Sequence, residues 1–113
     1  MKLNEYQKLS KRTMPDLPFP STLHRQLSLS NYAMGLAGES GEVVDLLKKH
    51  VHHRHTLKVV DIKAELGDVL HYVSGISSML GITLEDVATA NIEKLRKRYP
   101  NGFSEEASIN RSE

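Results

Sequence analysis

The chain has 113 residues, enough for one domain with a modest hydrophobic core, and small enough that dimerisation would help to bury apolar surface. Its 15 basic and 14 acidic residues give a formal net charge of +1, so no general electrostatic affinity for nucleic acid is indicated and we expect no nucleic-acid partner. The absence of cysteine excludes disulfides and thiolate metal sites.

Neither a membrane span nor a signal peptide is indicated. No apolar run approaches the ~20 residues that a membrane-spanning helix needs. The first residues, MKLNEYQKLSKRT, lack the apolar core of a signal peptide. We therefore expect a cytoplasmic protein without a membrane partner, folded as a single domain over residues 1–113.

The N-terminal segment is expected to be a short helix followed by a break. Residues 3–13 have weak helical periodicity through Leu3, Tyr6 and Leu9. The three prolines within residues 15–20 end this helix and favour an extended segment. We expect residues 1–20 to form an N-terminal helix and a proline-rich linker or lid.

A long helix is expected next, from an N-cap at Ser21 to about residue 50. Gly35, Gly38 and Gly41 interrupt its helical propensity, and each costs about 1 kcal/mol relative to alanine. Their spacing of three places them on one side of the helix. We predict that another helix or a ligand approaches closely there.

The connector of residues 50–58, HVHHRHTLK, carries four of the six histidines. It is followed by a third expected helix, which begins near residues 59–61, runs to residue 80 and has Gly81 as its C′ residue. Three of the connector histidines could bind a metal, but their spacing matches no zinc pattern. We interpret the connector as a solvated polar loop around His52, His53 and His55.

The last long helix has a clear start signal. Thr83, followed three residues later by Asp86, is typical of an N-cap with an acidic third helical residue, and predicts a helix over residues 84–99. Residues 104–113 are polar, and we expect a flexible tail. The pattern as a whole predicts an all-α fold, a bundle of four to five helices.

Two carboxylate pairs lie within these helices, Glu39 with Glu42 and Glu65 with Asp68. Because each pair is spaced by three residues, its members share one helical face. On a helical wheel the two members of each pair lie about 60° apart, and both pairs fall on the apolar side. A solvated run of charges would instead lie opposite the apolar stripe. Four carboxylates facing a helical core repel one another and lose hydration, so a cation is needed there.

The last helix carries a complementary set, because Asn91, Lys94 and Arg98 share the stripe of Leu84 and Leu95. Taken alone, the two basic side chains could equally snorkel from the edge of an apolar face or pair with acidic neighbours. Beside four inward carboxylates, however, an amide, an ammonium and a guanidinium are the groups that hold phosphates.

The chemistry of these residues indicates a metal-bridged polyphosphate site. An all-oxygen ligand set favours a hard divalent cation, Mg²⁺ with Mn²⁺ as a substitute. A ferritin-like di-iron site pairs Glu with a His three residues on, which neither Glu39 nor Glu65 has. The GxxxxGK[ST] pattern of P-loop enzymes is absent. The chemistry natural to such a site is attack of a metal-activated water on phosphorus.

The spacing of the carboxylates also carries a family resemblance. Glu39-Ser-Gly-Glu42, 22 intervening residues and Glu65-Leu-Gly-Asp68 resemble the ExxE and ExxD signature of the MazG-like all-α nucleotide pyrophosphohydrolases, relatives of dimeric dUTPases and dCTP pyrophosphatases. The segments GLAGESGEVVDLLKK, ELGDVLHYV and NIEKLRKRYPNGF are similar to the family's segments around its metal ligands and its phosphate-contacting final helix. The resemblance covers about residues 20–103.

The resemblance implies an all-α bundle of the NTP pyrophosphatase type, assembled through helix packing as a homodimer or homotetramer with the site near the subunit interface. It implies that one of the glutamates orients the attacking water, with Glu39 and Glu42 as the catalytic candidates. The implied Mg²⁺ ligands are Glu39, Glu42, Glu65 and Asp68, and the implied phosphate-binding residues are Asn91, Lys94 and Arg98.

The implied activity is Mg²⁺-dependent hydrolysis of an NTP or dNTP to the nucleoside monophosphate and pyrophosphate, in nucleotide-pool house-cleaning. Two alternatives stay open: a relative acting on another nucleotide such as phosphoribosyl-ATP, and a non-catalytic helical nucleotide-binding or regulatory module, against which the carboxylate quartet argues. Lys48 and Lys49 fit a helix-dipole pair better than a phosphate role. The preferred base is not indicated by the sequence. Core packing explains the presence of Tyr6, Phe19, His24 and Tyr32 without any of them stacking on a base.

Overall fold

The computed structural model describes residues 1–111, and its regular structure there is helical throughout. The prediction of an all-α fold is confirmed. The elements in chain order are α1 (Leu3–Ser10), the 3₁₀ turn η1 (Lys11–Thr13), α2 (Thr22–His52), α3 (Val59–Met79), α4 (Leu84–Arg98) and α5 (Glu105–Ile109).

The helix boundaries follow the capping signals of the sequence. The side chain of Ser21 accepts a hydrogen bond from the His24 backbone N–H at the start of α2, and Thr83 does the same for Asp86 at the start of α4. α3 ends just before Gly81, whose φ of 72° is in the left-handed region that glycine adopts at low cost. These three predicted boundaries are confirmed.

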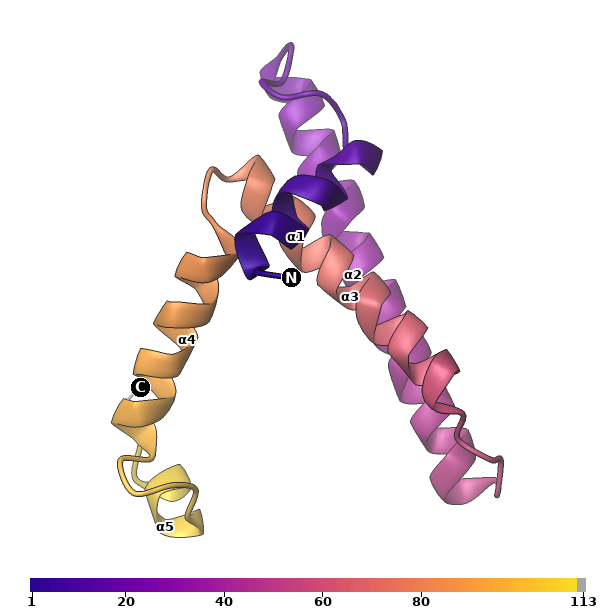
Figure 1. Cartoon of the computed structure of the whole chain (residues 1–113), viewed down its shortest axis with the longest axis vertical. Coiled ribbons are helices and arrows are strands. Elements are labelled where there is room, and N and C mark those ends of the chain that lie inside the picture. Colours follow the sequence, from indigo (N-terminus) through magenta and orange to yellow (C-terminus); the bar gives the residue numbers. More distant parts are fainter. Residues whose placement is uncertain (112–113) are drawn as a thin grey trace.

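The helices form an open inverted V (Figure 1). One leg is the long α2–α3 hairpin, whose helices lie side by side, and the other leg is α4 with α5 at its end. α1 lies across the apex, where α3 turns into α4. The radius of gyration of 17.2 Å exceeds the roughly 13 Å of a compact chain of this length, so the chain does not close on itself.

Two tyrosines interlock the hairpin, each lying over a glycine of the facing helix. A Cβ added at Gly35 would overlap the ring of Tyr72, and a Cβ added at Gly75 would overlap the ring of Tyr32. The two rings meet edge to face, with centroids 5.2 Å apart. The predicted close approach of another helix is therefore confirmed at Gly35. At the other two glycines of α2 the described part of the chain makes no such approach, and approach by a ligand or a second copy stays a prediction. Nothing lies within 4 Å of a Cβ added at Gly38 or Gly41.

The buried core of the single chain is small. Among residues 1–111 the buried apolar side chains are Tyr32, Met79 and Leu84. Many large apolar side chains of the α2–α3 hairpin are more than half exposed, including Leu23, Leu27, Met34, Val44, Val51, Val59, Val60 and Leu66. Soluble monomers rarely leave this much contiguous helix face uncovered.

The segments at the two ends of the chain complete the description. The linker of residues 14–20 contains a cis Leu17–Pro18 peptide bond and connects η1 to the Ser21 cap. α5 lies within the expected tail of residues 104–113, of which residues 112–113 lie outside the described part, and the flexibility of this tail stays a prediction. No helix within residues 1–111 is long and apolar enough to cross a membrane.

Candidate metal and phosphate site

Three of the four predicted carboxylates converge between α2 and α3. Oxygen atoms of Glu39, Glu65 and Asp68 all lie within 4.8 Å of one another. Glu39 comes from α2, and the other two lie one turn apart on α3. An exposed acidic group is common without an ion. Three carboxylates from two helices meeting at one point, however, form an oxygen-only ligand set suited to a hard divalent cation.

Glu42 lies on the next turn of α2, outside this carboxylate triad, which we define as Glu39, Glu65 and Asp68. The prediction that all four carboxylates face a buried interior is wrong for this chain by itself. Glu39 and Glu65 are half-buried, whereas Glu42 and Asp68 are exposed. The physical reason is that α4 stands away from the hairpin and leaves this face open (Figure 1).

Glu65 is the carboxylate whose charge is least favourable in the metal-free protein. Its pKa is raised, first because partial desolvation penalises the charged form, then because its carboxyl group is hydrogen-bonded to Glu39 and lies near the negative charges of Glu39, Asp68 and Glu42. Three of its perturbing neighbours are thus the other members of the predicted quartet. A bound cation would relieve all of these interactions at once.

Aromatic side chains lie one turn beyond the triad on α3. His71 follows Asp68 by three residues, and its ring centroid is 5.3 Å from that of Tyr72 and 6.0 Å from that of Tyr32. Burial, and then the negative charge of Asp68, raise the pKa of the Tyr6 hydroxyl in α1. This hydroxyl therefore lies near Asp68. His71 therefore packs against the tyrosines beside the triad and is not one of its members.

The predicted phosphate-binding residues lie elsewhere in the chain. Asn91 and Lys94 are exposed and Arg98 is half-buried, all on α4. Their helix forms the other leg of the V, so the single chain does not bring them to the triad (Figure 1). Beyond its first turn α4 has no hairpin against it within the single chain, so the shared inward stripe of these residues stays a prediction for an assembly of two or more copies.

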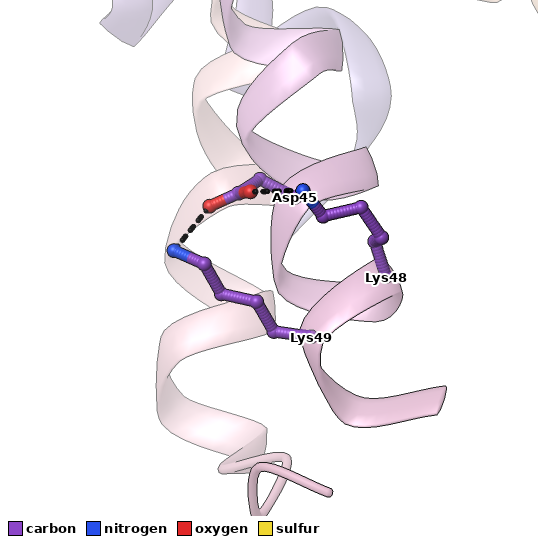
Figure 2. Close-up of polar contacts among 3 residues, drawn as sticks. All are labelled: Asp45, Lys48 and Lys49. Carbon is purple, nitrogen blue, oxygen red and sulfur yellow. Dashed lines mark ion pairs between the residues drawn. The ribbon is translucent and has the colours of Figure 1, made fainter. Parts of the chain in front are cut away.

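Lys48 and Lys49 pair with an acidic neighbour on their own helix, as Figure 2 shows. The ammonium of Lys49 lies 2.7 Å from one oxygen of Asp45, and that of Lys48 lies 3.6 Å from the other. The hydrogen bond from Lys49 lowers the pKa of Asp45, and the same bond raises the pKa of Lys49. This favours the interpretation of the two lysines as a local charge pair near the helix end.

The histidine-rich tip is exposed, as predicted for a solvated polar loop, although α2 continues through His52. His50 Nδ1 lies 2.8 Å from the carbonyl oxygen of His55, and the ring centroids of His53 and His55 are 6.3 Å apart. Among residues 1–111, the cluster whose ligand atoms converge well enough to hold a metal is the carboxylate triad, not this tip.

Comparison with known proteins identifies the domain that carries this triad. The family model of the MazG nucleotide pyrophosphohydrolase domain matches residues 27–103, a range that contains all seven predicted site residues. The chain belongs to this family. It is also similar to the Gene 37 protein of Mycobacterium phage L5, with 34% identity over 87 residues, which cover 74% of this chain and 76% of that protein. No solved structure gave a significant match.

Membership in the MazG family agrees with the geometry of the triad. The matched range begins within α2 and ends after α4, so it includes both legs of the V and leaves out α1 and the proline-rich linker. The helix pair that holds the carboxylates and the helix that carries Asn91 and Lys94 therefore belong to the family domain. The helix at the apex lies outside the matched range.

Proposed function

We propose that this MazG-family protein is a Mg²⁺-dependent nucleotide pyrophosphohydrolase. It cleaves an NTP or dNTP between the α and β phosphates, and releases the nucleoside monophosphate and pyrophosphate into the cytoplasmic nucleotide pool. The observation that carries the proposal is the convergence of Glu39, Glu65 and Asp68 within 4.8 Å, in a chain that belongs to a nucleotide pyrophosphohydrolase family.

The donor set fits Mg²⁺, or Mn²⁺ in its place, better than zinc or copper, because all three groups are carboxylates. Mg²⁺ held there would act as a Lewis acid for the phosphate oxygens and the attacking water. The triad itself contributes fixed negative charge on two packed helices. The raised pKa of Glu65 means that this charge is costly until a cation arrives, so the metal-free site is poised to bind one.

We assign different roles to the four carboxylates. Glu39, Glu65 and Asp68 hold the metal, because their oxygens already meet at one point. Glu42 lies one turn further along α2, exposed and outside the triad, so its carboxylate is available to orient the attacking water and accept a proton. This assignment selects Glu42 from the two catalytic candidates and leaves Glu39 as a metal ligand.

The phosphate-binding half of the site comes from α4, through Asn91, Lys94 and Arg98. Since the single chain keeps α4 away from the triad, we propose that a second copy completes the site in a homodimer or homotetramer. The exposed apolar side chains of the α2–α3 hairpin support this assembly, as does the radius of gyration of 17.2 Å. Packing the α2–α3 hairpins of two copies together would cover side chains such as Leu27, Met34 and Val51.

The activity is tested by incubating the purified protein with Mg²⁺ and a panel of canonical and modified NTPs and dNTPs. We expect pyrophosphate and a nucleoside monophosphate as products, with no activity in excess chelator. Asp68→Asn is the matched control, because it removes one triad charge and keeps the side-chain shape. Release of orthophosphate alone would contradict cleavage between the α and β phosphates, and nucleotide binding without any product would favour a non-catalytic module.

The assembly is tested by light scattering coupled to gel filtration. We expect a mass of two or four chains at micromolar concentration. Substituting a charged residue for an exposed apolar one, as in Leu27→Glu, should shift the mass towards one chain and lower the activity with it. A fully active monomer would contradict the proposal that a second copy completes the site.

A further inference from the structure

α1 is joined to the apex of the V by polar side chains at every third position. We call these four side chains, Asn4, Gln7, Ser10 and Thr13, the α1 ladder. The first three lie in α1 and the last in η1, whose three residues per turn keep Thr13 on the same face as the others. Each member contacts α3 or α4: Asn4 Nδ2 donates to Glu85 Oε2 at 3.1 Å, Gln7 Nε2 to Ser78 Oγ at 3.1 Å, Ser10 Oγ lies 2.9 Å from Ser74 Oγ, and Thr13 Oγ1 lies 3.5 Å from His71 Nε2.

Two of these side chains cap α4 from outside. The first N–H groups of an α-helix have no partner within the helix. At the start of α4, Gln7 Oε1 accepts from the Leu84 N–H at 2.8 Å, and Asn4 Oδ1 accepts from the Glu85 N–H at 3.2 Å. The next N–H, that of Asp86, is capped locally by Thr83. The first turn of α4 is therefore held as much by α1 as by its own N-cap.

Gln7 is the centre of this joint. Its side chain is buried, with 7% of the residue exposed, and all of its hydrogen-bonding groups point at the α3–α4 connection. While its oxygen caps α4, its nitrogen donates to Ser78 Oγ at the end of α3 and to the Ile82 carbonyl in the turn, the latter at 2.9 Å. One amide thus ties together the end of α3, the turn and the first residue of α4.

The joint sets the direction of α4 because little else does. α4 packs against α1 at its first turn and then extends away from the α2–α3 hairpin (Figure 1). Asn91 and Lys94 lie seven and ten residues after Leu84, which is about 10 and 15 Å along the axis. A rotation of about 10° at the joint would move Lys94 by roughly 2–3 Å, and misplacement by about 1 Å is enough to impair catalysis.

We propose that Gln7, assisted by Asn4, is a positioning residue that fixes the angle between α4 and the α2–α3 hairpin. It thereby sets where the phosphate-binding residues of α4 meet the carboxylate triad, whichever copy supplies the triad. The geometric part of this inference stands on the hydrogen bonds alone, and the catalytic part rests on the proposed function. Gln7 touches neither substrate nor metal ligand in this role, and it lies outside the range that the MazG family model matches.

The angle can be measured because the chain has no cysteine of its own. Spin labels at Lys58→Cys, at the N-cap of α3, and Lys97→Cys, near the end of α4, report the distance between the feet of the V by pulsed electron resonance. Labelled protein is mixed with excess unlabelled protein, so that only distances within one chain contribute. Both positions are exposed and outside the triad.

We expect Gln7→Leu to shift or broaden this distance distribution by several ångströms, since it keeps the bulk and removes every hydrogen bond. Ser10→Ala is the matched control, because it breaks a contact of α1 with α3 and none with α4, and it should leave the distribution unchanged. If Gln7→Leu does not fold, Asn4→Ala replaces it, as the exposed Asn4 contacts only the start of α4. An unchanged distribution in the folded variant overturns the proposal.

The catalytic part is tested on the same proteins without labels. We expect Gln7→Leu to lower kcat/KM about ten- to a hundredfold. Its Mg²⁺ affinity, measured by calorimetry, should stay that of the parent, because the triad is on the hairpin. Ser10→Ala should match the parent in both. A Gln7→Leu protein with a shifted distance and an unchanged kcat/KM overturns the catalytic part. If the parent itself has no activity, the proposed function is overturned, and a shifted distance in Gln7→Leu still supports the geometric part.

Discussion

The two legs of the V are built in opposite ways. The α2–α3 hairpin is interlocked at one level, with Tyr72 over Gly35 and Tyr32 over Gly75, and it holds three carboxylates within 4.8 Å. α4 is hydrogen-bonded to side chains of α1 at its first turn, and its Lys94, Arg96 and Lys97 are exposed. A metal site needs several ligands fixed to one another, so the proposed metal site lies on the interlocked pair of helices. The proposed phosphate-binding residues contact the substrate from its other side, so they can lie on a separate helix whose direction is set independently.

The largest effect is expected on the rigid leg. Asp68→Asn or Glu39→Gln should weaken Mg²⁺ binding and lower kcat at least about 100-fold, because each removes a charge from the point where the triad converges. Pyrophosphate release and calorimetric titration with Mg²⁺ measure the two quantities. The helical circular dichroism should stay intact, and retained activity in either variant would remove that residue from the site.

Glu42→Gln separates catalysis from metal binding on the same leg. Since Glu42 lies outside the triad, we expect its amide variant to lose kcat about 100-fold while its Mg²⁺ affinity stays within a few-fold of the parent. Parallel measurements of turnover and metal affinity give the comparison. An equal loss of both would make Glu42 a fourth metal ligand.

On the other leg, Lys94→Ala should lower kcat/KM about tenfold or more without changing Mg²⁺ affinity, because an ammonium that holds a phosphate is lost. Arg96→Ala is the control. It removes the same charge from the same helix, but from the face that lines a depression with Leu3 and Glu85. Equal losses in both variants would point to the overall charge of α4 and contradict a specific phosphate contact.

Stability gives a smaller but direct test of the interlock. Gly35→Ala should destabilise the protein by about 1–3 kcal/mol, because its methyl group would overlap the Tyr72 ring. Gly38→Ala on the same helix should stabilise it by up to about 1 kcal/mol, since its added Cβ meets open space. Urea unfolding measures both. A destabilising Gly38→Ala would reveal a second surface on this face, such as another copy of the hairpin.

The smallest effect concerns the charge of Glu65 without metal. Its pKa is raised in the folded protein, so the folded state binds this proton more tightly than the unfolded chain. The resulting stabilisation is present below the pKa of the unfolded chain and is lost as the pH rises through the folded pKa. At pH 7 in chelator, Glu65→Gln should therefore melt at most a few degrees higher than the parent, and this difference should vanish towards pH 4.

The same melting experiment contains its own controls. Added Mg²⁺ should raise the melting temperature of the parent more than that of Glu65→Gln, because a ligand stabilises the state that binds it. Glu93→Gln removes a carboxylate from α4, away from the triad, and should give neither effect. A Glu65→Gln protein that melts lower than the parent at pH 7 in chelator would contradict a costly metal-free charge cluster.

The local structure could be predicted from the sequence because its causes are local. Ser21, Thr83 and Gly81 set helix ends through bonds or backbone angles within a few residues. The carboxylate pairs were found for the same reason, since a spacing of three fixes a shared face. The family resemblance then supplied the range that the MazG domain model confirms.

The arrangement of the legs could not be predicted in this way. A helical wheel gives the apolar face of α4 but not the surface that covers it, so it could not tell whether Asn91 and Lys94 meet the carboxylates of their own chain or those of another copy. The cap supplied by Asn4 and Gln7 joins residues 77 to 81 positions apart, and no periodicity within α1 reveals such partners. Gly38 and Gly41 were expected to be covered for a similar reason, as spacing cannot tell an occupied groove from an empty one.

The long reach of the α1 ladder also has a consequence for the order of folding. Residues 4–10 are synthesised well before their partners, because the side chains that they bond lie 64 to 81 positions later. The α2–α3 hairpin can form in between from contacts much nearer in sequence, and such contacts close faster. α1 is therefore synthesised before the hairpin but can dock on the start of α4 only after it, and the direction of α4 is fixed only once Leu84 and Glu85 have been synthesised.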